Sequence, residues 1–140
     1  AVVDLAHWLG YRTVATDDRP ELVTEESMPN AEVRLAGTVD EALAAEPIHE
    51  HTSIVVVTRS HDMDVDIVPL LLNTPARYIG VMGSKRRWAA TRDRLVESGV
   101  PAADIDRVHV PIGIDIGAET VEEIAVSIMS EVIGTTTESQ

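Results

Sequence analysis

The residues with the clearest chemical potential are the consecutive Gly83-Ser84-Lys85-Arg86-Arg87, which follow the largely apolar stretch 77–82. Glycine permits a tight turn, serine can cap a helix, and the free amides at a helix N-terminus favour an anion. Three adjacent cations oppose the helix dipole at that end, so an anionic ligand would account for them. The pattern predicts an anion-binding turn, and a solvated first turn is the alternative.

A second polar stretch runs from Thr58 to Asp64, directly after the apolar run 53–58. Ligand binding or proton transfer by His61 or Asp64 is one interpretation, and capping of the next helix is the other. His61, Asp62 and Asp64 are suitable types of metal ligand, but their spacing fits no recognised metal signature. We therefore predict no metal site here.

Two further candidates follow predicted strands. The loop Pro111-Ile112-Gly113-Ile114-Asp115-Ile116-Gly117 comes after the strand 108–110, and Asp17 comes after the strand 12–16. Ligands of open parallel sheets bind beyond the carboxyl ends of the strands, and an acidic residue at the position of Asp17 characteristically binds a ribose hydroxyl. For Asp17 an ordinary turn carboxylate is the alternative.

The elements that position these residues alternate between strands and helices. Strands are expected at 12–16, 32–36, 53–58, 77–82 and 108–110, and helices at 1–9, 38–45, 65–72, 84–98 and from 120 to about 134. Thr38 with Glu41 and Thr120 with Glu123 fit the capping box, and Pro69 falls in a predicted first turn. This order predicts an α/β fold, a Rossmann-like, doubly wound, mostly parallel sheet.

The opening helix has no residue before it to act as N-cap. We therefore expect the chain to start inside a larger domain, with the amino-terminal strand and the glycine-rich loop missing. One domain is predicted over residues 1–134, and a polar tail over 135–140 is expected to be disordered.

Composition excludes several function classes. The chain has 140 residues, of which 24 are acidic and 11 basic, and its net charge of −13 repels nucleic acid and anionic membranes. It has no cysteine and no apolar stretch long enough to span a membrane, which favours a soluble, cytoplasmic protein. No nucleophile–base pair or paired carboxylates can be recognised, so catalysis is not supported.

Three segments of the sequence resemble the carboxy-terminal domain of the XdhC/CoxI family of accessory proteins. They are 58–64, 75–87 and 111–128, and the resemblance covers most of the chain from Gly10 onward. The family pattern is similar to Gly-Ser-Arg-Arg and Pro-Ile-Gly-Leu-Asp-Ile-Gly, and the positions that match directly are Gly83, Ser84, Pro111, Gly113, Asp115 and Gly117. Asp64 also matches. Lys85 and Ile114 depart mildly from the pattern. Arg59 also departs from it, because relatives often have His at that position.

The resemblance implies a protein that binds the molybdenum cofactor (molybdopterin), assists its sulfuration by a cysteine desulfurase, and inserts it into a xanthine dehydrogenase-type molybdenum hydroxylase apoenzyme. Physically, a pterin with a phosphate or an attached nucleotide would suit the end of the sheet, with its phosphate on the Gly83 turn and its polar edges at the Thr58 and 111–117 loops. The family's amino-terminal region, with a cysteine implicated in cofactor binding, lies outside this sequence.

Two other hypotheses remain open from the sequence. Asp17 and the order of elements are compatible with an NAD(P)-binding oxidoreductase or dinucleotide sensor. A docking domain for the hydroxylase or the desulfurase, with no small ligand, is the third. The sequence leaves a homodimer open.

Overall fold

The computed structural model describes residues 1–58 and 60–138, without the side chains of residues 61 and 136–138. By its internal contacts the chain divides into two compact units, residues 1–47 with 115–130 and residues 48–114 with the remainder from 131. Both contain parallel strands and helices, which confirms the predicted α/β class.

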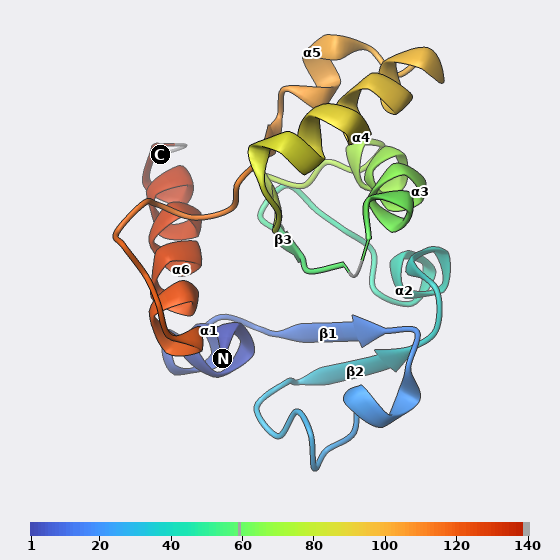
Figure 1. Cartoon of the computed structure of the whole chain (residues 1–140). Helices are drawn as coiled ribbons and strands as arrows, with labels where there is room; N and C mark the ends of the chain where they lie inside the picture. Colours follow the sequence, from blue (N-terminus) through green and yellow to red (C-terminus); the bar gives the residue numbers. More distant parts are fainter. Residues whose placement is uncertain (59, 139–140) are drawn as a thin grey trace. The chain divides into compact units, whose positions relative to one another are not determined.

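The first unit contains a two-stranded parallel sheet (Figure 1). Strand β1 (Val14–Asp17) pairs with β2 (Val33–Ala36), and Asp17 lies opposite Ala36. The unit also holds α1 (Val2–Trp8), the short 3-10 helix η1 (Pro20–Leu22), α2 (Val39–Ala45) and the first part of α6 (Val121–Glu138). A small core forms beside the sheet from Ala15, Val23 and Ala31.

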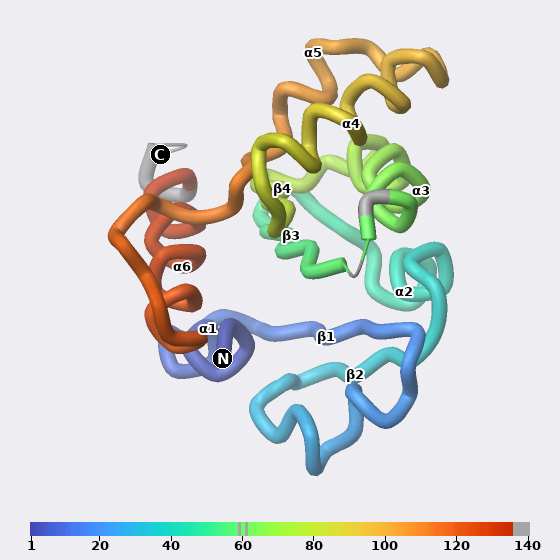
Figure 2. Tube along the Cα trace, in the orientation of Figure 1, coloured from blue at the N-terminus to red at the C-terminus, as the bar shows by residue number. Residues whose placement is uncertain are grey.

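The second unit contains a three-stranded parallel sheet in the order β3 (Ser53–Val56), β4 (Tyr78–Val81), β5 (Val108–His109). The traces of β3 and β4 lie side by side in Figure 2. Helices α3 (His61–Leu72), α4 (Lys85–Glu97) and α5 (Ala102–Ile105) connect the strands, and α3 packs against α4. All four residues of β4 are buried, as expected for a central parallel strand. Consequently the loops after β3 and β4 meet at one edge.

Residues that the sequence indicates as helix ends do lie at helix ends in the structure. Thr38 and Glu41 form the predicted capping box at the start of α2. Thr120 and Glu123 bond reciprocally at the start of α6, where backbone amides of Thr120 and Glu119 lower the pKa of Glu123. Gly10 and Gly99 follow helix ends with positive φ angles of 92° and 93°. These boundaries are set by hydrogen bonds between near neighbours in sequence.

The structure corrects the sequence prediction at α3. The helix begins at His61 and not near residue 65, because Ser60 caps it by accepting a hydrogen bond from the Met63 amide. Pro69 therefore lies inside the helix and not in its first turn, and the ring removes one backbone hydrogen bond there. The four-residue α5 was also not predicted, and α6 continues through Glu138, beyond residue 134. Within the described residues, no helix is long and apolar enough to cross a membrane.

Candidate functional site

The Gly83 turn joins β4 to α4. Gly83 has a φ of 149°, which side chains rarely tolerate, and a Cβ built on it would lie 3.6 Å from Cδ of Arg87. Ser84 caps α4, since its Oγ accepts a hydrogen bond from the Arg87 amide at 3.0 Å. The predicted turn and cap are therefore both present. The free amides of the first turn of α4, with the positive end of the helix dipole, follow the end of β4.

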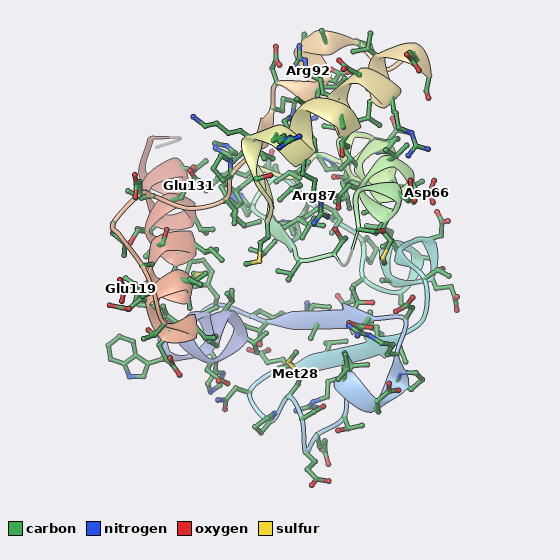
Figure 3. The ribbon with its side chains drawn as sticks, in the orientation of Figure 1. Met28, Asp66, Arg87, Arg92, Glu119 and Glu131 are labelled. Atoms are coloured by element: carbon green, nitrogen blue, oxygen red, sulfur yellow. The ribbon has the colours of Figure 1, made fainter. Side chains whose placement is uncertain are left out.

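Helix α4 carries five of the eleven basic residues of the chain. Three of them pair with carboxylates: Arg87 with Asp64 at 2.8 Å, Arg94 with Asp62 at 2.5 Å, and Arg92 with Asp106. Figure 3 labels Arg87 near α3 and Arg92 further along α4. Lys85 and Arg86 are exposed, and neither side chain has a carboxylate partner in the part of the chain that the structure describes. The uncompensated charge of α4 is thus concentrated at the turn.

The loops after β3 and β4 meet through Thr58, Asp64 and Arg87. Nη2 of Arg87 donates to Oδ2 of Asp64 at 2.8 Å and to Oγ1 of Thr58 at 2.9 Å, and the Thr58 hydroxyl donates to Oδ1 of Asp64. Asp64 is only 1% exposed, and a carboxylate buried to that degree requires such partners. Arg87 is therefore committed to an internal ion pair, which separates its role from that of Lys85 and Arg86.

The guanidinium of Arg87 also lies close to the turn. A Cβ on Gly83 would be 3.8 Å from Nε of Arg87, and this nitrogen is buried without a hydrogen-bond partner among the described residues. A Cβ at position 83 would make only ordinary van der Waals contact with Arg87, so the backbone conformation, and not a lack of space, favours glycine there.

The loop after β5 begins beside the same turn. The amide of Ile112 donates to the carbonyl of Val81 at 3.2 Å, two residues before Gly83. Gly113 follows with a φ of 94°, and its amide donates to Oε1 of Glu131 at 3.1 Å. The peptide bond before Pro111 is cis. The second unit therefore brings Pro111 and Gly113 to the edge where Gly83 lies, as the sequence predicts.

A partly buried polar cluster adjoins this loop, and sequence reasoning missed it. Oε1 of Glu131 also accepts a hydrogen bond from the Tyr78 hydroxyl at 2.6 Å, and Oε2 lies 3.8 Å from Nδ1 of His109. The rings of Tyr78 and His109 stack with centroids 4.7 Å apart. Burial, together with the hydrogen bond to Glu131, raises the pKa of Tyr78.

Of this cluster, only Tyr78 could have been connected with a neighbour from the sequence alone. Tyr78 and Gly80 are two residues apart and so share a face of β4. A Cβ at position 80 would lie 2.4 Å from the Tyr78 hydroxyl oxygen and 2.6 Å from Cγ1 of Ile112, so this glycine makes room for both. Glu131, however, lies 53 residues after Tyr78, and no local pattern relates the two.

The remaining predicted site residues lie elsewhere or outside the description. Asp17, Asp115 and Gly117 belong to the first unit. The Asp17 carboxylate accepts three hydrogen bonds from Arg19, which lower its pKa to about 2, and Oδ1 of Asp115 accepts one from the Gly117 amide. The side chain of His61 and the whole of Arg59 lie outside the described residues. Among those described, no three potential ligands are grouped to hold a metal ion.

Known proteins are similar to this chain in sequence and in fold. A family model described as "XdhC Rossmann domain" matches residues 1–132. The chain is 31% identical over 134 residues to a protein of Bacillus subtilis (strain 168) that is named as a probable subunit of xanthine dehydrogenase, and the match covers 96% of this chain and 38% of the relative. It is 29% identical to the uncharacterized protein YqeB of Escherichia coli (strain K12), over 95% of this chain and 24% of the relative.

A solved structure shows the same similarity in three dimensions. It is a crystal structure described as a xanthine dehydrogenase from Bacillus halodurans, with a TM-score of 0.79 and 29% sequence identity. The match covers 99% of this chain and 39% of that protein. The chain thus spans about two fifths or less of the length of the proteins that it matches.

Proposed function

This chain belongs to the XdhC Rossmann domain family, and we propose that it is an accessory module of a xanthine dehydrogenase-type enzyme. In this proposal the Gly83 turn holds the phosphate of the molybdenum cofactor. The module would keep the cofactor while a cysteine desulfurase adds sulfur, and would then assist its insertion into the apoenzyme. The name of the Bacillus subtilis relative supports the link to xanthine dehydrogenase.

The observation that carries the proposal is that some basic side chains of α4 are paired with carboxylates and others are not. Arg87, Arg92 and Arg94 are paired with carboxylates of neighbouring elements, whereas Lys85 and Arg86 stay exposed at the capped turn. In a chain with a net charge of −13, two cations that have no carboxylate partner among the described residues favour a bound anion beside free helix amides.

The neighbouring polar groups suit the rest of such a ligand. Thr58 and the 111–113 loop flank the turn within the second unit, and in this proposal the polar edges of a pterin lie against them. The phosphate would contact Lys85, Arg86 and the first free amides of α4. Arg87 would remain with Asp64 and support the turn from within.

The test is a charge-matched pair of double variants. We expect Lys85→Ala with Arg86→Ala to abolish co-purification of pterin with the protein, measured by fluorescence after oxidation of the released cofactor. Arg92→Ala with Arg94→Ala removes the same charge from the same helix and should retain the pterin. Equal pterin content in both double variants and the parent would refute the proposed phosphate site.

A dinucleotide is the second candidate, favoured by the position of Asp17 at the carboxyl end of β1. That carboxylate is already engaged by the Arg19 side chain and amide, so a ribose hydroxyl would have to compete with an arginine. We therefore expect isothermal titration calorimetry with NAD⁺ and NADP⁺ to give no binding heat. Saturable binding of either nucleotide would favour the second candidate.

A further inference from the structure

We propose that Glu131 is a positioning residue for the anion site, and that it acts through the amide of Gly113. Figure 3 labels Glu131 on α6, in the part of that helix that belongs to the second unit. The inference rests on the proposed function, because it concerns the loop that flanks the Gly83 turn. It gives a role to a residue on an element outside the three predicted ligand loops.

The first step is the connection from Glu131 to the turn. Oε1 of Glu131 accepts the Gly113 amide at 3.1 Å, and the preceding Ile112 amide is bonded to the Val81 carbonyl at 3.2 Å. Val81 is the last residue of β4, immediately before Met82 and Gly83. Loop 111–113 is consequently fixed at two successive amides, one by the strand that leads into the turn and one by Glu131.

The second step is that Glu131 is itself fixed. The Tyr78 hydroxyl donates to the same Oε1 at 2.6 Å, and Tyr78 is only 1% exposed. His109, stacked on Tyr78, lies next to the other carboxylate oxygen. A carboxylate held by a buried phenol is a preorganised acceptor, and its hydrogen bonds are stronger than those of neutral acceptors.

The third step concerns how the chain runs. It leaves the second unit after Ile114 and returns to it at Glu131, having contributed residues 115–130 to the first unit. The bond from Gly113 to Glu131 therefore joins the points of departure and return. Gly113 has a φ of 94°, and because glycine is conformationally permissive, such a hydrogen bond restricts the conformations open to it. Without Glu131, loop 111–113 loses its second attachment.

If Glu131 were only a structural anchor, its substitution would have a different effect from that expected of a positioning residue. An anchor affects ligand binding only as far as it affects stability. Substitution of a positioning residue lowers the affinity of the site by more than the loss of stability explains. In that case we also expect the Gly113 amide to respond to the ligand. The experiment therefore needs both a control of matched stability and a signal from Gly113.

The test titrates the 140-residue chain with inorganic pyrophosphate, followed by calorimetry and by ¹H–¹⁵N NMR. We expect Glu131→Ala to weaken pyrophosphate binding about tenfold, as for loss of a hydrogen bond to a charged group. Glu131→Gln keeps an acceptor oxygen and should lose less. In the parent chain the Gly113 amide signal should shift during the titration, and in Glu131→Ala it should start from a different position.

The control is Ile105→Val, a substitution at a fully buried residue of α5. Its pyrophosphate affinity should equal that of the parent, and Tm values show how far each variant is destabilised. The inference is overturned if Glu131→Ala binds pyrophosphate as tightly as the parent, or if the Gly113 signal is insensitive to pyrophosphate. It is also overturned if the loss of affinity per degree of lost Tm is the same in Ile105→Val as in Glu131→Ala.

Failure of the proposed function gives a different pattern. If Lys85→Ala with Arg86→Ala leaves pyrophosphate binding unchanged, the anion is held elsewhere and both proposals fall. If that double variant loses binding while Glu131→Ala retains it, the anion site stands and only the role of Glu131 is refuted.

Discussion

The carboxyl ends of β1 and β3 each lead to an aspartate paired with an arginine, yet the two pairs are built differently. Asp17 pairs with Arg19, two residues away, and both side chains are partly exposed to solvent. Asp64 pairs with Arg87, 23 residues away on another helix, and its carboxylate is buried. The first pair shapes a local turn, whereas the second connects two helices beside the candidate site.

This difference matters energetically because water screens the Asp17–Arg19 pair more than the Asp64–Arg87 pair, whose carboxylate is buried. An exposed ion pair contributes little to stability, since both groups are well solvated when separated. Removing one partner of a buried pair leaves an uncompensated charge in the protein interior. The contrast between Asp17 and Asp64 therefore predicts that substitutions in the two ion pairs lower the free energy of unfolding by very different amounts.

The largest effect should come from Arg87→Ala. It leaves the buried Asp64 carboxylate with the Thr58 hydroxyl as its remaining side-chain donor among the described residues, and we expect the free energy of unfolding to fall by about 3 kcal/mol. Urea denaturation followed by circular dichroism measures the change. Arg92→Ala, on the same helix with an exposed partner, should cost less than about 1 kcal/mol. Equal losses in the two variants would contradict the distinction drawn between buried and exposed pairs.

The smallest effect should come from Asp17→Asn, and it should depend on pH. The hydrogen bonds from Arg19 lower the pKa of Asp17 to about 2, below its value in an unfolded chain. The ionised carboxylate therefore contributes stability at neutral pH, and this contribution is lost as the pH falls from about 4 toward 2.

Thermal unfolding at several pH values tests this expectation. The Tm of Asp17→Asn should be lower than that of the parent at pH 7, by an amount corresponding to less than about 1 kcal/mol, and the two should converge near pH 2. A difference in Tm that persists or grows at low pH would show that the Arg19 pair does not stabilise the folded state.

Much of the fold could be predicted from local patterns. Apolar runs identified the strands, the capping residues Thr38 and Thr120 marked helix starts, and the XdhC resemblance is confirmed by the family model. The start of α3 was predicted too late, because the polar residues after Ser60 suit a loop as well as a first helical turn. Pro69 reinforced that error, since proline is commoner at a helix start than inside one.

Short-range sequence was enough to specify the Gly83 turn, the Ser84 cap and the cluster of three cations, because glycine conformation and helix capping depend on residues within one turn of each other. Long-range packing settled which of those cations are available. Asp64 neutralises Arg87 across two helices, while Lys85 and Arg86 stay exposed, and Glu131 reaches the 111–113 loop from a helix far along the chain. Such pairings depend on how buried elements pack, and no spacing in the sequence encodes them.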